Sequence, residues 1–337
     1  MLFGLTLKKK AASPEKTPTR KRGRSKESQG ESWQRVLDKV EKFVVERPDD
    51  HIASLLARFR ELDIGRKDPK LFYKKTNLVR PLGERIAASG GYDLDDTLYY
   101  PDVCEGRYTT STVSVIRYLM GCIRSDTRAV VEFGSGWSSN LFQLYVALGT
   151  TRSRRIHYHG AEYTDEGQEC GRKIAKHDGK INYTAHPFDY RKPDASFLKD
   201  CKGHVLVFTK HSVEQVDLID PDLYEQLWQL QADVTLVHFE PVGWQRSSAL
   251  MARRAADDDK FFDKIGERLG GDVKSVDRQM ANAAWWSWRN AYNTNLLSIV
   301  EDYTAREKFK LVKREYDFSG TANVLNPSTL LHLERRA

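Results

Sequence analysis

The amino-acid sequence predicts an α/β fold in which helices cover both faces of a mostly parallel sheet. Three observations lead to this prediction. A strand-like apolar run at residues 128–133 ends in an acidic residue and a Gly-x-Gly turn, and a helical pattern follows it. Four further strand-like runs come later in the chain, each ending in polar or aromatic residues. Two final strand-like runs, residues 309–316 and 329–334, follow a helical pattern over residues 293–306.

The turn after the first predicted strand carries the strongest local signal. Gly134 and Gly136 follow the strand, and Leu141, Leu144 and Leu148 then recur at helical spacing. Glycines at the end of a buried parallel strand let the backbone turn tightly and approach a ligand closely. The free N–H groups of the next helix point back at that ligand. A Gly-x-Gly alone is equally typical of an ordinary strand-to-helix turn.

Glu132 stands two residues before the first glycine and narrows the class of ligand. A carboxylate at this position would repel the pyrophosphate of a nicotinamide cofactor. The same carboxylate would attract a cofactor that carries an amino group and a sulfonium centre. The sequence therefore favours a cationic cofactor at this turn.

Acidic and aromatic residues follow the later predicted strands, where an open α/β sheet binds its ligands. These strands and the residues that follow them are 155–161 with Glu162 and Tyr163, 180–187 with Phe188 and Asp189, 204–209, and 233–239 with Glu240. An acidic residue at the end of a second strand binds ribose hydroxyls in dinucleotide folds, and Glu162 fits that position.

In this order of strands and motifs, from about Tyr108 to the C-terminus, the chain resembles class I S-adenosylmethionine-dependent methyltransferases. The resemblance implies a Rossmann-like seven-stranded sheet with an antiparallel last strand, closed by a hairpin near Asn326-Pro327-Ser328. It also implies S-adenosylmethionine as the cofactor, with its ribose on Glu162. Residues implied to bind the cofactor are Glu132, Gly134, Ser135, Gly136, Trp137, Ser138, Glu162, Tyr163, Phe188, Asp189 and Thr209. Ser138 stands where the family has a third glycine, and Trp137 either covers the cofactor or packs beneath it.

The acceptor site is expected at the ends of the fourth and fifth strands. His211 follows the fourth strand and is the predicted general base, because imidazole can take a proton from a hydroxyl near neutral pH. Ser212-x-x-Gln215 is also a capping-box pattern, so His211 alternatively only precedes a helix cap. Glu214 either orients the imidazole or is a surface charge. Glu240 is the second candidate base, or a residue that positions an acceptor hydroxyl.

Residues 243–292 form a long insertion after the fifth strand, of the kind that often serves as a lid. Trp285, Trp288 and Tyr292 share one helical face. They are either core residues or rings that hold a sugar, since indole faces beside amides bind sugar rings well. The acidic run at residues 257–259 is expected to be a solvated helix face.

The N-terminal region divides into a basic tail at residues 1–31 and a helical region at residues 32–107. Residues 1–31 contain nine Lys or Arg and three Glu, whereas the rest of the chain is almost neutral. This tail has too few apolar residues to fold and is predicted to be disordered. It is either a solvated extension or a contact for an anionic surface or acidic partner. Residues 33–44, beginning with Trp33, and 52–62 form two apolar stripes, which are expected to be packing surface.

Composition adds limits on location and metals. No apolar run reaches about 18 residues, so no transmembrane segment is expected. The four cysteines are scattered without a C-x-x-C pair, which is typical of a reducing, cytoplasmic protein without a metal site.

The segments at residues 211–215, 240–241, 292–296 and 326–328 resemble those of bacterial sugar O-methyltransferases. The predicted function is therefore methylation of a hydroxyl on a sugar or another small acceptor, by direct displacement with a general base. Two other classes stay open. One is a non-catalytic module that binds the cofactor or recruits partners, and the other is a nicotinamide-dependent oxidoreductase.

Overall fold

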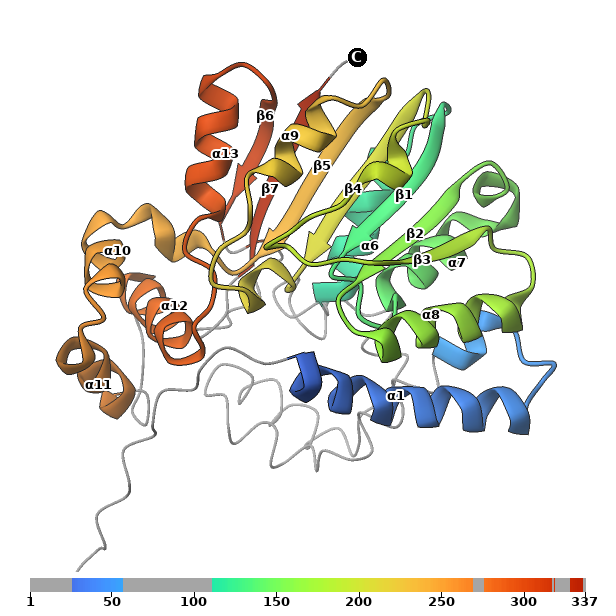
Figure 1. The fold of residues 1–337 in the computed structure, drawn as a ribbon, viewed down its shortest axis with the longest axis horizontal. Coiled ribbons are helices and arrows are strands. Elements are labelled where there is room, and N and C mark those ends of the chain that lie inside the picture. Colours follow the sequence, from blue (N-terminus) through green and yellow to red (C-terminus); the bar gives the residue numbers. More distant parts are fainter. Residues whose placement is uncertain (1–25, 57–110, 269–275, 317, 319–327, 336–337) are drawn as a thin grey trace, which may run out of the picture.

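A seven-stranded sheet forms the centre of the protein (Figure 1). The computed structural model describes residues 26–56, 111–268, 276–316, 318 and 328–335. The strand order is β3-β2-β1-β4-β5-β7-β6; β1 to β5 are parallel, and β7 runs antiparallel to both neighbours. The strands are β1 Thr127–Phe133, β2 His157–Glu162, β3 Tyr183–Pro187, β4 His204–Lys210, β5 Asp233–Glu240, β6 Lys310–Glu315 and β7 Thr329–Arg335. The predicted Rossmann-like sheet with an antiparallel last strand is confirmed.

The residue types in each strand match how deeply the strand is buried in the sheet. Central parallel strands are mostly apolar because helices cover them on both faces, and β4 is buried from His204 to Thr209. The edge strand β6 carries exposed basic residues, which discourage pairing with another chain. β3 begins three residues later than the sequence predicts. The carboxylate of Asp178 accepts the N–H groups of Lys180 and Ile181 and so holds them in a turn.

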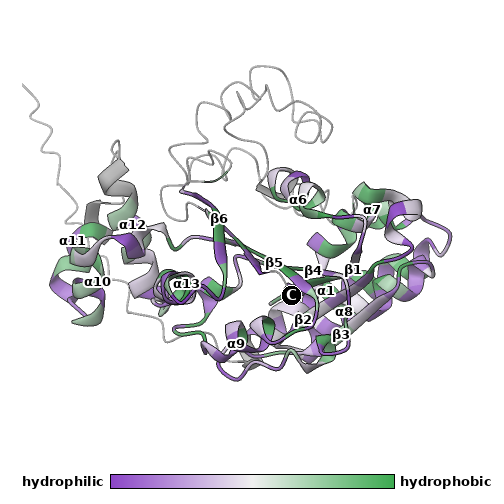
Figure 2. Cartoon of the chain, turned by 90° about the horizontal axis from the view of Figure 1, so that it is seen from above, coloured by the Kyte–Doolittle hydropathy of each residue, from purple (hydrophilic) through white to green (hydrophobic). Residues whose placement is uncertain are grey.

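Helices cover the two faces of the sheet as two separate apolar layers (Figure 2). One layer contains α1 Lys26–Glu46, α6 Ser111–Cys122, α7 Ser139–Ser153 and α8 Asp165–Asp178. The other contains the short helix η2 Ser196–Leu198, α9 Asp222–Trp228 and α13 Leu296–Ala305. No helix in the described ranges is long and apolar enough to span a membrane.

The insertion after β5 is helical and has a small core of its own. It consists of η4 Gly243–Arg246, α10 Ser248–Ala255, α11 Asp259–Arg268 and α12 Val276–Asn290, which lie together beside α13 (Figure 1). Trp285 and Trp288 are buried in this core, and Trp288 stacks on Phe262 with ring centroids 5.2 Å apart. The Trp288 indole N–H donates to Asp257 over 2.9 Å. Of the two alternatives for these tryptophans, the structure supports core packing.

The N-terminal helix α1 corrects the predicted boundary of the basic tail. The helix begins at Lys26, so the last six residues of the expected tail, 26–31, belong to the folded protein. Its apolar stripe does pack as expected, with Leu37, Val40 and Phe43 buried. Residues 52–56 form the start of the second predicted helix. Residues 1–25 and 57–110, which include the rest of both predictions, lie outside the described residues.

Candidate active site

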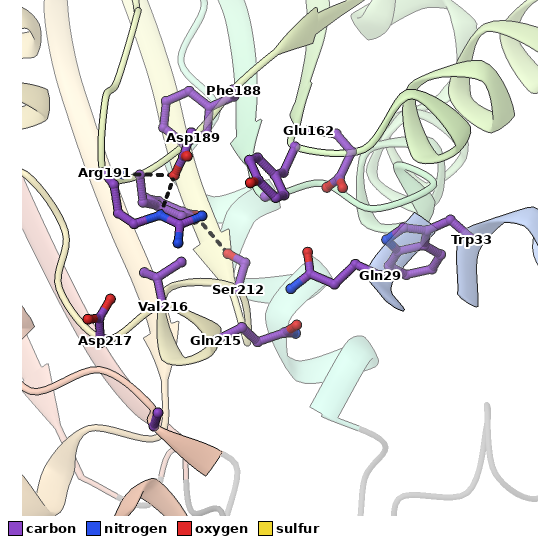
Figure 3. Close-up of a pocket in the computed structure, with 14 residues that line it drawn as sticks. Gln29, Trp33, Glu162, Phe188, Asp189, Arg191, Ser212, Gln215, Val216 and Asp217 are labelled. Carbon is purple, nitrogen blue, oxygen red and sulfur yellow. Dashed lines mark hydrogen bonds and ion pairs between the residues drawn. The ribbon is translucent and has the colours of Figure 1, made fainter. Parts of the chain in front are cut away.

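A cavity of about 300 Å³ lies at the carboxyl ends of β1 and β2, beside α1 (Figure 3). Open α/β sheets bind ligands at this edge. The lining combines aromatic rings, carboxylates and amides with one guanidinium group. Its residues are Gln29, Trp33, Gly134, Glu162, Tyr163, Phe188, Asp189, Tyr190, Arg191, Ser212, Gln215, Val216, Asp217 and Ala291.

The structure brings five of the predicted cofactor residues to this cavity. They are Gly134, Glu162, Tyr163, Phe188 and Asp189. The remaining six do not line it: Glu132, Ser135, Gly136, Trp137, Ser138 and Thr209. Each of these six is instead in contact with another part of the fold.

The two glycines of the turn are required by backbone angle and by space. Gly134 has φ +65°, and a Cβ there would lie 2.4 Å from the Cβ of Ser212. Gly136 has φ +54°, and a Cβ there would lie 2.8 Å from the Trp33 ring. Both angles lie in the left-handed region that disfavours other residues. The turn therefore fits closely between the loop after β4 and helix α1.

Glu162 at the end of β2 connects the glycine turn to the start of α8. Its Oε2 accepts the Gly136 N–H over 2.8 Å, and its Oε1 accepts the Thr164 hydroxyl over 2.8 Å and the Thr164 N–H over 3.0 Å. Burial raises the pKa of Glu162, and these donors oppose that rise. A ribose diol on this carboxylate would have to replace a present donor, and the rotatable Thr164 hydroxyl is the easiest to replace.

Glu132 lies behind the turn rather than on the cavity surface. It is 1% exposed, and its Oε1 accepts the Asn140 side-chain N–H over 2.6 Å. The Leu141 backbone N–H also bonds this carboxyl group. Burial raises the pKa of Glu132 to about 8. The carboxyl group therefore bonds one backbone N–H and one side chain in the first turn of α7.

The other residues that miss the cavity pack within the fold. The Ser138 hydroxyl bonds the Tyr183 hydroxyl at 2.8 Å and Ser135 at 3.2 Å. Trp137 is partly buried and packs against the apolar layer that contains α7. Thr209 is fully buried and bonds His238 at 2.9 Å. The indole on the cavity belongs to Trp33 instead.

The segment after β3 forms an aromatic and acidic wall of the cavity. Phe188 stacks on Phe133 with centroids 4.4 Å apart, and Asp189 accepts the Arg191 Nε–H over 3.0 Å. The Tyr190 hydroxyl donates to the Phe133 carbonyl over 2.7 Å and so ties this wall to the end of β1. Arg191 in turn lies over the Tyr163 ring at 5.5 Å.

Helix α1 supplies a wall of the cavity. Its sequence predicts only packing surface and part of the basic tail. Gln29 and Trp33 project into the cavity opposite Arg191 and Val216 (Figure 3). The helix can approach this closely because Gly30 leaves room: a Cβ there would lie 2.9 Å from the Glu166 carboxylate on α8. The spacing of Trp33 in its apolar stripe predicts packing, but not that the partly buried ring faces a cavity.

The loop after β4 does not form the predicted capping box. The short helix η3, Val213–Gln215, has Ser212 at its N-cap position without a side-chain cap bond. The Ser212 hydroxyl instead donates to the Phe133 carbonyl over 3.0 Å, and Gln215 donates to the His211 carbonyl over 2.9 Å. Both residues line the cavity. The sequence shows that Ser212 and Gln215 are spaced for a helix cap, but it does not show the backbone carbonyls that they bond instead.

His211 is held between a hydroxyl and a carboxylate. Its Nε2 lies 2.6 Å from the Ser328 hydroxyl, and its Nδ1 lies 3.4 Å from the Glu214 carboxylate. Its backbone has φ +52°, an unfavourable angle for a residue with a Cβ. The side chain is 30% exposed, whereas Glu214 and Ser328 are buried. Glu214 is thus a partner of the imidazole and not the alternative surface charge.

Glu240 is fully buried and bonds the backbone of the loop after β4. Its carboxylate accepts the N–H groups of Ser212 at 3.2 Å, Val213 at 3.3 Å and Glu214 at 3.2 Å. Burial raises the pKa of Glu240 to about 7, while attraction to His211 lowers it. These contacts position the loop that carries His211. They leave the carboxylate without the exposure that a base toward an acceptor needs.

Comparison with known proteins adds distant structural likenesses. No family model matches the chain, and no curated protein sequence matches it. A SAM-dependent methyltransferase from Aquifex aeolicus matches with 9% identity and a TM-score of 0.37, over 75% of this chain and 98% of that one. Magnesium protoporphyrin IX methyltransferase from Synechocystis PCC 6803 matches with 14% identity and a TM-score of 0.37, over 77% of this chain and 95% of that one. Mitomycin 7-O-methyltransferase matches with 12% identity and a TM-score of 0.36, over 74% of this chain and 62% of that one. The fold is assigned from the strand order above and not from these likenesses.

Proposed function

We propose that the chain is an S-adenosylmethionine-dependent methyltransferase that transfers the methyl group to a hydroxyl of a small acceptor. The observation that carries the proposal is the convergence of three strand ends on one cavity. Gly134 after β1, Glu162 at the end of β2 and Asp189 after β3 all line it. In a sheet of this strand order, these are the positions that meet a nucleoside ligand at the carboxyl edge.

The lining fits the parts of this cofactor. The Glu162 carboxylate suits the ribose hydroxyls, because it is a charged acceptor at the end of the second strand. Phe188 and Tyr163 offer aromatic faces to the adenine, and Asp189 offers an acceptor for its amino group. Trp33 closes the cavity from α1. When bound, the cofactor supplies an electrophilic methyl group on a sulfonium centre.

The start of α7 favours this cofactor over a nicotinamide dinucleotide. A dinucleotide fold uses the free N–H groups at this helix end to bind pyrophosphate. Here the Glu132 carboxyl group bonds Leu141 and the Asn140 side chain at that end. A pyrophosphate would have to displace a buried acidic group from those donors. A cofactor without phosphate needs no such displacement.

His211 is the proposed general base toward the acceptor hydroxyl. It is the partly exposed member of its group, and it lies at the end of β4 between Glu214 and Ser328. Removing the hydroxyl proton as the oxygen attacks typically contributes a factor of about 10²–10⁴. Glu240 is proposed to position the loop and not to act as the base. The remaining rate is expected from holding the two reacting atoms in line.

The acceptor is proposed to be a small hydroxyl compound, with a sugar as the narrower class implied by the sequence resemblance. Burial of Trp285 and Trp288 removes their rings as support for sugar binding. An anionic surface stays the proposed partner of the basic residues before Lys26. Cytoplasmic location likewise stays a proposal from the cysteine pattern.

The experiment that tests this function uses a methyl-labelled cofactor and extract metabolites as acceptors. We expect label in an acid-stable ether product formed by the full chain, together with S-adenosylhomocysteine. Label on carbon or nitrogen would show a methyltransferase with another acceptor atom. Cofactor binding without any labelled product from a broad set of acceptors would favour the non-catalytic module.

A further inference from the structure

His211, Glu214 and Ser328 come from two separate parts of the chain and meet at one edge of the sheet. Because β7 is antiparallel, its first residue Thr329 pairs with Glu240 at the carboxyl end of β5. Ser328, which directly precedes β7, therefore stands at the ligand-binding edge. The loop after β4 brings the imidazole to the same edge. The buried Ser328 hydroxyl, the His211 imidazole and the Glu214 carboxylate thus form a row of three groups joined by two contacts.

The order of these groups fixes which nitrogen of the ring can accept a proton. A carboxylate 3.4 Å from Nδ1 favours the tautomer with its proton on Nδ1. Nε2 then carries the lone pair, and the Ser328 hydroxyl 2.6 Å away is its donor. In this arrangement Nε2 already accepts a hydrogen bond from Ser328. An acceptor hydroxyl reaches it either by displacing Ser328 or through Ser328.

The positions of the groups favour transfer through Ser328. Ser328 is 4% exposed and is fixed by the Phe318 N–H, which donates to its carbonyl over 2.7 Å. The imidazole is likewise fixed, because the His211 N–H donates to the Phe239 carbonyl and Gln215 donates to the His211 carbonyl. Displacing the Ser328 hydroxyl would require it to rotate away from Nε2 inside a buried site and to give up the 2.6 Å hydrogen bond. A hydroxyl has two acceptor positions, so Ser328 can receive one proton while it donates another.

We infer that Ser328 relays the acceptor's proton to His211 and that Glu214 is a positioning residue for the imidazole. The inference rests on the proposed methylation of a hydroxyl. As the acceptor oxygen forms its bond to the methyl carbon, its proton passes to Ser328 Oγ. The original Ser328 proton passes to His211 Nε2, and the Glu214 carboxylate balances the imidazolium charge. The methyl donor keeps the electron pair of the carbon–sulfur bond.

The first test is the tautomer of His211, measured by nitrogen-15 NMR on the full chain with labelled histidine and no cofactor. His211→Gln assigns the signal among the nine histidines. We expect the proton on Nδ1 and a hydrogen-bonded Nε2. Ser328→Ala should remove that hydrogen bond, and Glu214→Gln should allow the Nε2–H tautomer. Thr329→Val is the matched control: its hydroxyl is buried and has no hydrogen-bond partner among the residues that the structure describes, so its loss should leave the ring signals unchanged.

A wild-type ring with its proton on Nε2 would overturn the relay, because Nε2 would then have no lone pair to accept the Ser328 proton. This result does not depend on the cofactor or on activity. The relay and the proposed function can therefore fail separately.

The second test is single-turnover methyl transfer at saturating cofactor. Ser328→Ala should slow the transfer at least tenfold with unchanged cofactor affinity, and Ser328→Thr should restore most of it because it keeps a hydroxyl. Ser328→Ala as fast as wild type would overturn the relay and show that the acceptor reaches His211 directly. Glu214→Gln should lower the rate more than Glu214→Asp. Equal rates in these two would remove the positioning role.

Discussion

The cavity rim after β1, β2 and β3 and the rim around β4, β5 and β7 use similar residues in different ways. In the first rim, Glu162, Phe188 and Asp189 present their side chains to a cavity. In the second rim, His211 contacts both Glu214 and Ser328, and none of the three lines that cavity. The first rim is therefore organised to hold a ligand. The second is organised to hold a base in one orientation, which is what proton transfer requires.

The largest effect should come from filling the turn that joins the two rims. Gly134→Ala adds a carbon 2.4 Å from the Cβ of Ser212 at φ +65°. Backbone strain and overpacking together should cost about 2–5 kcal/mol of unfolding free energy. Gly179→Ala is the control with the same φ, and no atom of the described ranges lies nearer than 3.9 Å to the added carbon, so strain alone should cost about 1–2 kcal/mol. Urea denaturation measures both, and equal losses would show that the turn is not tightly packed.

Removing the proposed base should impair turnover, which depends on the second rim, but not cofactor binding, which depends on the first. His211→Ala should reduce turnover at least about a hundredfold, or about 2.7 kcal/mol, and change cofactor affinity little. Steady-state kinetics and a cofactor titration measure the two effects. Glu240→Gln is the comparison variant. If it folds and is inactive while His211→Ala stays active, the base has been assigned to the wrong residue.

The buried carboxyl group behind the first rim should give a pH-dependent stability. The pKa of Glu132 is about 8 in the folded protein because of burial, above the ordinary carboxyl value. As pH rises from about 4.5 to 8, the unfolded chain ionises this group and the folded chain does not, so folding loses stability. Glu132→Gln should therefore gain on the wild type by about 1.4 kcal/mol per pH unit over this range. Urea denaturation at pH 5 and pH 8 measures the gain, and a constant difference would show that Glu132 is ionised in the fold.

The smallest effect is expected from deleting residues 1–25. These residues hold eight of the 54 Lys and Arg residues and one of the 47 Asp and Glu residues, so the rest of the chain is neutral. Because Gln29 and Trp33 are kept, unfolding free energy and cofactor affinity should change by less than about 0.5 kcal/mol. Binding to anionic vesicles in low salt should be lost. Loss of cofactor affinity in the truncated chain would instead make these residues part of the site.

The difference between the two rims also explains which parts of the site the sequence predicts. Strand order and the residues that directly follow strands were predictable, because buried strands have a clear apolar pattern and ligands bind at their carboxyl ends. Glu162 and Asp189 were found in this way. Glu132 was also identified by position, but its burial and its bonds to the start of α7 depend on packing that no local pattern encodes.

The residues that were missed come from elements distant in sequence. Trp33 carries the same apolar signal whether its ring faces a core or a ligand. Ser328 was noted only as part of a closing hairpin, because its contact with His211 spans 117 positions. The spacing of Ser212 and Gln215 predicted a helix cap, but each found a tertiary partner instead.

The most direct test of the central claim is calorimetric titration of the full chain with S-adenosylmethionine and with NAD. We predict one binding site for S-adenosylmethionine and none for NAD. Glu162→Gln should weaken the binding by about 1.5–3 kcal/mol, the usual contribution of hydrogen bonds to a charged acceptor. Absence of S-adenosylmethionine binding, or tighter binding of NAD, would contradict the assignment of the cavity and with it the proposed function.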